Sequence, residues 1–381
     1  ARLRFTDPRP PAGPPEPAAG GLPPVPLDPA RDLYGTVLFQ GERFQRLRRY
    51  HRAAAREVDA DLAAEARASW FADFLPSDLL LGDPGVRDAL MHGNQVCVPH
   101  ATLLPVGIER LYPSGQVGAG ELRYCATERR RDGDLYVYDV ALRTPAGELV
   151  ERWQGLHLRA VRKSDGRGPW PAPLLGPYLE RMVEDLLGAQ IAVAVEPDPP
   201  GAGDDPTARR TRTALAAGRA LGYPADVRYR PDGRPELRCP AGPGRPNDVG
   251  PDGGPGISAS HGGGLTLCLI GTGAIGCDLE PVAARPASVW QGLLGAHAEL
   301  ARVVAGATGE DADTAATRVW TAIECLQKSG RSPAGPLALR PEPSGGWAVF
   351  GSGQVGVATL AATVRGLASP VVVALLAEEC R

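Results

Sequence analysis

The chain has 381 residues, of which 43% are hydrophobic, and this is enough for two or three domains with their own cores. Its 41 Lys and Arg residues nearly balance 44 Asp and Glu residues, which gives a net charge of −3. This balance argues against nucleic-acid or membrane-surface binding, and no apolar run approaches the ~18 residues of a membrane helix. The seven cysteines include no CxxC pair, which predicts free thiols in a reducing cytoplasm rather than disulfides or a zinc site.

Residues 1–30 are rich in proline, glycine and alanine, and this composition predicts an extended linker. The chain begins with alanine and carries no signal-peptide pattern. We therefore expect it to be a fragment of a longer protein.

Residues 31–162 predict an α+β domain, because one helix pattern interrupts several strand patterns. The helix is expected at 85–94. Strands are expected at 117–122, 134–142 and 149–158, and the last two are separated by turn residues that predict a hairpin.

Asp88 and His92 lie four residues apart in the helix pattern, so their side chains are expected on one helix face. A carboxylic acid beside an imidazole can carry out acid–base catalysis. The alternative is a hydrogen-bonded pair on a helix surface, and the spacing alone favours that alternative.

Residues 163–177 are again rich in proline and glycine and predict a second linker before a region at 178–381. Helix and strand patterns follow one another in this region. Helices are expected at 178–187, 208–221, 296–305 and 315–329, strands at 191–195, 226–229, 265–270, 276–279, 347–350, 355–363 and 371–376, and a loop at 239–256.

Residues 271–276 contain the glycine pattern GxGxxG of dinucleotide-binding folds. That pattern needs a helix after it, whereas here the following residues alternate like a strand and end at Pro281. We therefore interpret the glycines as a hairpin turn.

Two short segments bring carboxylates into regular spacing. Asp278 and Glu280 stand at i and i+2, so on a strand they leave the same face. Trp320, Glu324 and Lys328 stand at i, i+4 and i+8, so on a helix they form one ridge. Three carboxylates and a lysine that converge suit a divalent cation that holds a phosphate.

Lys328 is one of only two lysines in this arginine-rich chain, the other being Lys163. A lysine kept in such a composition indicates a need for a compact ammonium group rather than a planar guanidinium. The alternative, an ordinary solvated helix residue, remains equally open from the spacing alone.

Ser258, Ser260 and His261 precede three consecutive glycines. Glycine lets backbone amides approach an anion closely, so this segment can bind a phosphate. The alternative is a flexible turn with a solvated histidine, which the segment alone favours.

Several arginines lie on the helix pattern at 208–221, among them Arg212 and Arg219, which are two turns apart. Arg234 follows in a turn sequence. Arginines near a phosphate-binding segment suit a phosphorylated ligand. In so arginine-rich a chain, each one alone is more simply explained as a surface residue.

Taken in order, these motifs resemble the larger, pseudo-dimeric type of 4′-phosphopantetheinyl transferase. The resemblance covers about 170–381 and depends on Ala-Ala-Gly-Arg219, Gly233-Arg234-Pro235, Ser258-Ala259-Ser260-His261, Gly276-Cys277-Asp278-Leu279-Glu280 and Trp320-Thr321…Glu324…Lys328. It implies a pseudo-twofold α/β domain at 178–381, with the site between two similar halves.

The resemblance also implies roles for these residues. Asp278, Glu280 and Glu324 would bind Mg²⁺, which bridges the pyrophosphate of coenzyme A. Lys328 would hold the phosphate, and Glu324 or a metal-bound water would accept the proton of the attacking serine of an acyl carrier protein. The nucleotide and pyrophosphate would be contacted by Arg212, Arg219, Arg234, Ser260 and His261. One basic contact is missing, because Ile323 stands where this family commonly has lysine.

Residues 31–162 resemble the second half of a polyketide synthase dehydratase, a double hot-dog. The resemblance depends on Leu33-Tyr34-Gly35…Leu38-Phe39-Gln40-Gly41…Phe44-Gln45-Arg46 and on Gly82-Asp83-Pro84…Asp88…His92. It implies that Asp88 is the dehydratase acid with His92 as its partner. The catalytic histidine of an HxxxGxxxxP segment, expected in the first half, is absent from this chain, so the region alone is expected to be inactive.

The order of a dehydratase followed by a transferase resembles the C-terminal end of an enediyne-type iterative polyketide synthase, as do the segments 70–76 and 103–107. Three hypotheses follow: a transferase dependent on Mg²⁺ and coenzyme A, a dehydratase half with a vestigial transferase, or a non-catalytic docking and dimerisation end. The expected partners are an acyl carrier protein, the rest of the synthase and a second copy through the dehydratase.

Overall fold

A computed structural model describes residues 21–64, 83–113, 120–203, 205–238, 254–332, 336–341 and 345–378. The chain divides into a first unit, Ala1–Lys163, and a second unit, Ser164–Arg381. Several predicted segments lie outside the described residues: residues 1–20 of the linker predicted at 1–30, the segment 70–76, the start of the strand predicted at 117–122 and most of the loop predicted at 239–256.

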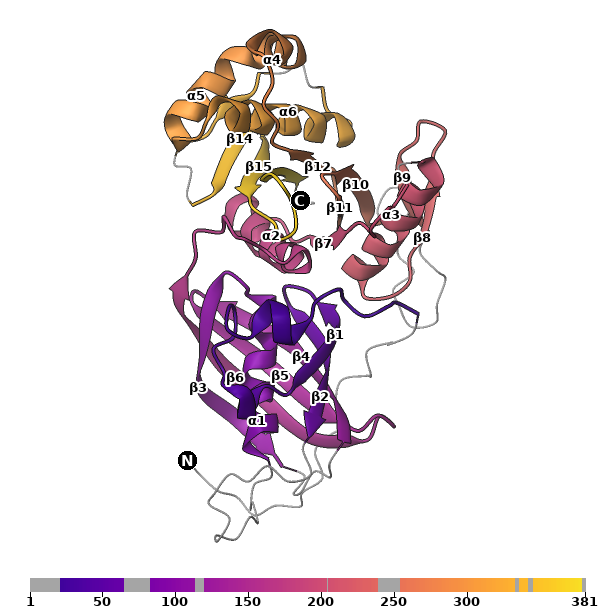
Figure 1. Cartoon of the computed structure of the whole chain (residues 1–381), viewed down its shortest axis with the longest axis vertical. Helices are drawn as coiled ribbons and strands as arrows, with labels where there is room; N and C mark the ends of the chain where they lie inside the picture. The colour runs from indigo at the N-terminus through magenta and orange to yellow at the C-terminus, as the bar shows by residue number, and fades with distance from the viewer. Residues whose placement is uncertain are drawn as a thin grey trace. The chain divides into compact units, whose positions relative to one another are not determined.

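The first unit is built on a six-stranded antiparallel sheet with the order β1-β2-β4-β5-β6-β3 (Figure 1). Its strands are β1 (Leu47–Ala53), β2 (Glu57–Ala64), β3 (Ala101–Tyr112), β4 (Gly120–Asp132), β5 (Leu135–Arg143) and β6 (Leu149–Lys163). The predicted hairpin of the last two strands is confirmed by the pairing of β5 with β6.

One helix, α1 (Pro84–His92), lies against this sheet and continues into the 3₁₀ turn η3 (Gly93–Cys97). Asp83 caps its start by accepting a hydrogen bond from the Gly85 amide at 2.8 Å, and Pro84 occupies the first turn. The helix buries Val86, Ala89 and Leu90. A sheet around one central helix is the hot-dog arrangement, so the α+β prediction is confirmed for this unit.

The sequence prediction missed β1, β2 and β3, and the pairing explains two of these omissions. Register shifts interrupt the ladders of β1 with β2 and of β3 with β6, so hydrophobic residues do not alternate regularly. In β3 the Pro105-Val106-Gly107 sequence also lowers the strand signal. Before the sheet, η1 (Pro29–Leu33) and η2 (Glu42–Phe44) form two short helical turns.

The second unit contains a three-stranded sheet with the order β10-β11-β7 and a short β8-β9 ribbon. These strands are β7 (Ala192–Pro197), β8 (Asp226–Tyr229), β9 (Pro235–Arg238), β10 (Gly256–Gly262) and β11 (Leu265–Gly271), and they are accompanied by α2 (Ala172–Leu187) and α3 (Pro206–Leu221). Helix α2 begins inside the segment 163–177 that was predicted as a linker. Residues 257–262 form strand β10, so their prediction as a flexible turn was wrong.

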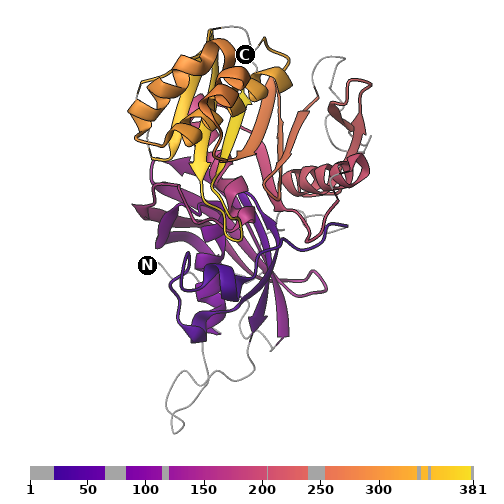
Figure 2. The same cartoon turned by 45° about the horizontal axis from the view of Figure 1, so that its top comes forward.

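A five-stranded sheet with the order β12-β16-β15-β14-β13 forms the rest of the second unit. Its strands are β12 (Ile275–Pro281), β13 (Ala338–Leu339), β14 (Trp347–Ser352), β15 (Val355–Ala362) and β16 (Val371–Ala377). The helices α4 (Ala287–Leu294), α5 (Ala298–Thr308) and α6 (Ala312–Lys328), with the turn η4 (Gly295–His297), cover one face (Figure 2).

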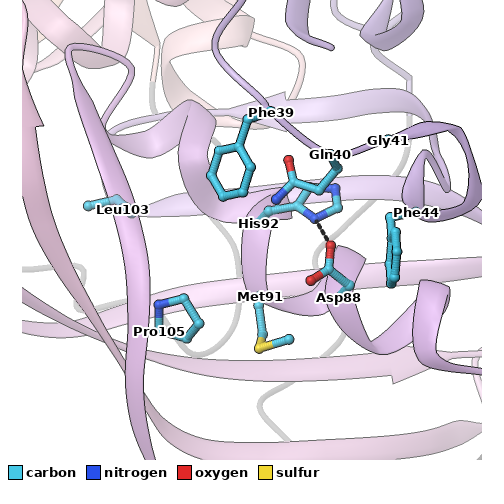
Figure 3. A pocket seen from close by; sticks show the side chains of 9 residues that line it. All are labelled: Phe39, Gln40, Gly41, Phe44, Asp88, Met91, His92, Leu103 and Pro105. Atoms are coloured by element: carbon cyan, nitrogen blue, oxygen red, sulfur yellow. Dashed lines mark hydrogen bonds and ion pairs between the residues drawn. The ribbon is translucent and has the colours of Figure 1, made fainter. Parts of the chain in front are cut away.

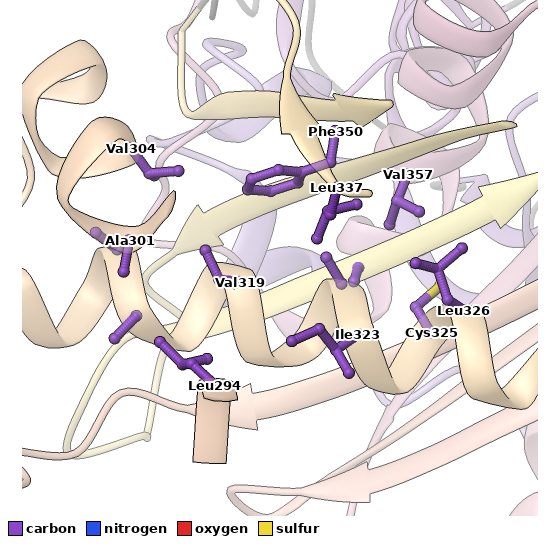
Figure 4. Close-up of a cluster of buried hydrophobic side chains, with 14 of the residues drawn as sticks. Leu294, Ala301, Val304, Val319, Ile323, Cys325, Leu326, Leu337, Phe350 and Val357 are labelled. Atoms are coloured by element: carbon purple, nitrogen blue, oxygen red, sulfur yellow. The ribbon is translucent and has the colours of Figure 1, made fainter. Parts of the chain in front are cut away.

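The core of this half lies between α6 and the sheet. Val319 and Leu326 of α6 pack with Phe350, Val357 and other buried side chains (Figure 4). Because hydrophobic burial is the main favourable term in folding, this core fixes the position of α6 over the sheet.

All ladders between named strands of the second unit are antiparallel in the described residues. The expected α/β organisation is therefore corrected to helices packed on antiparallel sheets. Residues 272–274 form a turn, with Gly273 at φ 75°, and no helix follows. The turn is confirmed, but β11 and β12 belong to different sheets, so it is not a hairpin.

Candidate functional sites

The first site is the Asp88–His92 pair, which lies on one face of α1 as predicted. His92 Nδ1 stands 3.0 Å from Asp88 Oδ2. The His92 side chain is 7% exposed, whereas that of Asp88 is 28% exposed. The imidazole is therefore part of the interior and the carboxyl is accessible from outside.

The pair opens into a cavity of about 280 Å³. Figure 3 shows the hydrogen bond of Asp88 with His92 between the side chains that line this cavity. The lining comes from the segment before η2, from η2, from α1 and from β3, and comprises Phe39, Gln40, Gly41, Phe44, Asp88, Met91, His92, Leu103 and Pro105. An apolar cavity with one acid–imidazole pair suits an acyl chain that carries a reacting polar group.

The sequence analysis gave no role to Tyr34, although it quoted this residue within a motif. Its hydroxyl oxygen lies 3.2 Å from His92 Nε2, on the nitrogen that does not face Asp88. No spacing rule connects residues so far apart in sequence, so only the fold reveals this contact.

The second site centres on Asp278 of β12, which is 3% exposed. Its Oδ1 accepts hydrogen bonds from Lys328 Nζ at 2.6 Å and from Ser260 Oγ at 2.9 Å. Its Oδ2 is buried and has no hydrogen-bond partner among the residues that the structure describes. A buried carboxylate oxygen without a partner is costly unless a ligand or ion completes it.

Gly276 makes this assembly possible, because a Cβ atom there would collide with the carbonyl oxygen of Cys325. Without a side chain at this position, α6 approaches β12 closely. The approach brings Glu324 and Lys328 of α6 to the carboxylates of β12, as the family resemblance implied.

The negative charge of Asp278 acts on both Glu280 and Glu324. Burial, and then the charge of Asp278, raises the pKa of the Glu280 carboxyl, and Glu324 adds to this effect. Burial and Asp278 likewise raise the pKa of Glu324. The positive charges of Arg285 and Lys328 oppose the rise in the pKa of Glu280. Arg285 was not among the predicted site residues.

Lys328 remains charged in this setting. Burial alone would lower its pKa, but the Asp278 carboxylate together with Cys277 and Cys325 more than offsets burial, and the net pKa is raised. The interpretation of Lys328 as an ordinary solvated residue is thus wrong, since its ammonium is bonded to a buried carboxylate.

Ser260 and His261 are neighbours on β10, but they lie on opposite faces of the strand. Ser260 points to Asp278, whereas His261 Nε2 lies 3.1 Å from Thr213 Oγ1 of α3. Burial, and then the charge of Arg212, lowers the pKa of the His261 imidazole. The two residues therefore belong to different clusters.

The three predicted arginines have different surroundings. Arg212 pairs with Asp198 at 3.2 Å beside His261. Arg234 is exposed and donates to the Gln327 carbonyl at 3.3 Å, at the end of α6 that carries Lys328. Arg219 is buried and its Nε lies 3.1 Å from Glu196 Oε1, so this guanidinium forms an internal ion pair, and its contact with a ligand stays a prediction.

No group of three or more His, Cys, Asp or Glu side chains is arranged to hold a metal ion by itself among the described residues. Mg²⁺, however, is usually bound by one or two carboxylates together with substrate phosphates and water. The open Asp278 Oδ2 and the nearby glutamates fit that kind of site rather than a closed cage of protein ligands.

None of the helices in the described residues has the length and hydropathy that a membrane-spanning helix requires.

Residues 11–167 match the family model described as polyketide synthase dehydratase N-terminal domain. This match supports a polyketide synthase dehydratase region in the first unit, as its sequence resemblance implied. The description names an N-terminal domain, whereas the resemblance implied a second half. None of the curated protein sequences matches the chain.

Solved structures similar to part of the chain include an enoyl-isomerase of a trans-acyltransferase polyketide synthase, with 17% identity over 31% of this chain and 46% of that one, at a TM-score of 0.27. The dehydratase domain of RzxB from Pseudomonas fluorescens has 20% identity over 32% and 42%, at a TM-score of 0.26. The dehydratase domain of PpsC from Mycobacterium tuberculosis, in complex with C12:1-CoA, has 18% identity over 32% and 46%, also at 0.26. The chain spans less than half of the length of each of these structures.

Proposed function

We propose that the first unit supplies the acid of a β-hydroxyacyl dehydratase site. The observation that carries the proposal is the Asp88–His92 pair in an apolar cavity, within the region that matches the dehydratase family. In the reaction a base removes the α-proton, the C–O bond at the β-carbon breaks, and the hydroxyl leaves as water. Asp88 would give its proton to the departing oxygen while His92 holds the other carboxyl oxygen.

The base must come from elsewhere in the synthase, because no segment of this chain has the HxxxGxxxxP pattern. In this proposal the chain is the second half of a double hot-dog, and the missing histidine belongs to the first half. This chain alone would then bind a β-hydroxyacyl group without dehydrating it, because it has the cavity but not the base.

The test uses the full synthase with Asp88→Asn, which keeps the shape of the side chain but cannot donate the proton. We expect β-hydroxyacyl groups to accumulate on the carrier in place of enoyl groups, as measured by mass spectrometry of carrier-bound intermediates. Asp132→Asn, an exposed change in the same unit, is the matched control. Unchanged dehydration in Asp88→Asn would rule out this role.

We also propose that the second unit transfers 4′-phosphopantetheine from coenzyme A to a serine of an acyl carrier protein. The observation in favour is the buried Asp278, which lies beside two glutamates. One of its oxygens is held by Lys328 and Ser260, and the other has no hydrogen-bond partner among the described residues. Asp278, Glu280 and Glu324 would hold Mg²⁺, which would neutralise charge on the pyrophosphate of coenzyme A.

In this reaction the carrier serine oxygen bonds to the β-phosphorus, and the bond to the leaving 3′,5′-ADP breaks. Glu324, or a water on the metal, would accept the serine proton. Lys328 would stabilise negative charge on the transferred phosphate. Arg212 and His261 would bind the phosphates of the nucleotide.

The test is the mass of an apo acyl carrier protein after incubation with this chain, coenzyme A and Mg²⁺. We expect a gain of one phosphopantetheine that EDTA abolishes and that Glu324→Gln greatly reduces. Glu299→Gln, on the exposed surface of α5, is the control and should leave the gain intact. No gain with any carrier would favour the docking and dimerisation hypothesis for this unit.

We place both units in an enediyne-type iterative polyketide synthase, because a dehydratase followed by a transferase is the order that this class implies. In this proposal the transferase acts on the carrier domain of its own synthase. Expression of the synthase with Glu324→Gln should then leave its internal carrier without phosphopantetheine, unless another transferase of the host modifies it.

A further inference from the structure

The imidazole of His92 is held from both sides, by Asp88 at Nδ1 and by the Tyr34 hydroxyl at Nε2. Tyr34 follows η1 directly and is 8% exposed. Its ring meets the imidazole edge-on, with centroids 5.9 Å apart and planes at 76°. Tyr34 is not among the described residues that line the cavity, whereas His92 is, so we expect Tyr34 to act on a bound substrate through His92.

The direction of the Tyr34 hydrogen bond follows from its other partners. Its oxygen accepts a hydrogen bond from the Leu47 amide at 3.3 Å. Burial raises the pKa of Tyr34 to about 12, against the opposing hydrogen bonds from the backbone of Leu47 and Arg46. The phenol therefore keeps its proton, and with backbone donors on its oxygen that proton points to His92 Nε2.

The hydrogen bond between Asp88 and His92 requires the same tautomer of the His92 imidazole. An ionised carboxyl, or one that carries its acid proton on Oδ1, only accepts at Oδ2, so His92 Nδ1 has to carry a hydrogen to bond Asp88 Oδ2. In a neutral imidazole the other nitrogen is then an acceptor, which is the partner that the Tyr34 hydroxyl needs. Both neighbours thus select one tautomer of His92.

We propose that Tyr34 is a positioning residue of the dehydratase site, which fixes the Nδ1–H tautomer of His92 and thereby the Asp88 carboxyl that faces the cavity. The consequence for turnover rests on the dehydration proposed above, but the tautomer does not. With His92 on Oδ2, the second oxygen of Asp88 is left for the substrate hydroxyl. A change of tautomer would remove the hydrogen from Nδ1 and free the carboxyl to rotate.

The first measurement is made on the unmodified chain, and a substitution is needed only to assign the signal. In the chain with isotope-labelled histidine, a two-bond proton–nitrogen correlation spectrum reports which ring nitrogen carries hydrogen, and His92→Gln identifies the signal. We expect a single Nδ1–H tautomer for His92. An Nε2–H tautomer in the unmodified protein would overturn the proposal.

The second measurement compares Tyr34→Phe with Tyr50→Phe. The Tyr50 hydroxyl is also buried, and it donates its hydrogen bond to the Gly93 carbonyl, next to His92, rather than to the imidazole. We expect Tyr50→Phe to keep the single tautomer and Tyr34→Phe to lose it, with both variants folded by thermal unfolding. The same His92 spectrum in Tyr34→Phe as in the unmodified chain would also overturn the proposal.

In the full synthase, Tyr34→Phe should lower the kcat of dehydration by roughly 10- to 100-fold with little change in KM, as is typical when the support of a catalytic group is removed. If Asp88→Asn leaves dehydration unchanged, the proposed function fails, but the spectra still test the tautomer. If Asp88→Asn abolishes dehydration and Tyr34→Phe changes neither kcat nor the spectrum, the positioning role alone fails.

Discussion

The two candidate sites each contain an aspartate bonded to a basic side chain, but they are assembled over very different distances in sequence. Asp88 and His92 are four residues apart on one helix, and their atoms are 3.0 Å apart. Asp278 and Lys328 are fifty residues apart and their atoms are 2.6 Å apart. The first pair needs only α1, whereas the second needs β12 and α6 to pack correctly.

Because of this difference, the two sites have different requirements for activity. The pair in the first unit is formed locally, and in the proposed dehydration the base comes from another part of the synthase. The cluster in the second unit has its charged residues together, but it depends on the packing that brings α6 to β12. A substitution in the first pair should therefore affect catalysis with little effect on folding. A substitution in the second cluster can affect both, because the cluster depends on packing.

The largest expected effect is the loss of transfer in Asp278→Asn. The amide cannot supply negative charge to a divalent cation or to Lys328, so transfer should fall by about 10²-fold or more. Dehydration in the same synthase should stay unchanged, because Asp88 lies in the other unit. Both activities are measured on carrier-bound intermediates, and a joint loss would show that the substitution unfolds the chain instead.

A second effect concerns folding of the second unit alone. Arg318 of α6 is 1% exposed, with Glu310 on two of its nitrogens and the Thr359 carbonyl at 2.8 Å. Because Arg318→Met leaves the Glu310 charge buried without its partner, we expect a loss of about 3–5 kcal/mol in the free energy of unfolding. Urea unfolding should show this loss in the second unit only. Arg302→Met, which breaks the exposed pair with Glu299, should change stability by less than about 1 kcal/mol.

The same contrast explains how far the sequence alone could go. Spacing of four on a helix was sufficient to predict the Asp88–His92 pair, because both residues share one element. Spacing also predicted that Glu324 and Lys328 share a face. No spacing rule could predict that this face meets Asp278, and only the resemblance to a family suggested it.

Some features were missed because they depend on tertiary packing. The Tyr34–His92 contact joins residues 58 positions apart. Arg219 and Glu196 form a buried pair between α3 and β7, which in sequence looks like one more surface arginine. The bulged strands β1 and β3 lack the regular alternation that identifies a strand.

A third prediction uses the raised pKa values of Glu280 and Glu324. Because the folded unit holds these protons more tightly than the unfolded chain, their contribution to stability is complete below the ordinary value of 4.5 and is lost as the pH rises through the raised values. Mg²⁺ needs the ionised carboxylates, so its stabilising effect should grow over the same pH range. At 100 times its Kd the gain approaches roughly 2.7 kcal/mol.

The measurement is thermal unfolding of the chain with and without Mg²⁺ at several pH values in the weakly acidic to neutral range. Glu324→Gln should reduce the Mg²⁺-dependent shift, whereas the exposed Glu299→Gln should not. A shift that is equal at all pH values, or equal in both variants, would contradict a site made of these carboxylates.

The smallest expected effect concerns His261, whose pKa is lowered by burial and then by Arg212. The unliganded imidazole is therefore neutral near pH 7, and a phosphate beside it would favour the protonated form. Coenzyme A binding would then take up a proton, and its affinity should fall as the pH rises, by at most about tenfold per pH unit.

The comparison that isolates this effect is coenzyme A against coenzyme A without its 3′-phosphate, between about pH 5.5 and 7.5. If His261 contacts the 3′-phosphate, the ratio of the two KM values should depend on pH in the unmodified chain and become flat in His261→Gln. Thr213→Val, which removes the hydroxyl beside Nε2 but keeps the imidazole, should retain the pH dependence. A ratio that is flat in the unmodified chain would place His261 away from that phosphate, and its hydrogen bonds to α3 would then be purely structural.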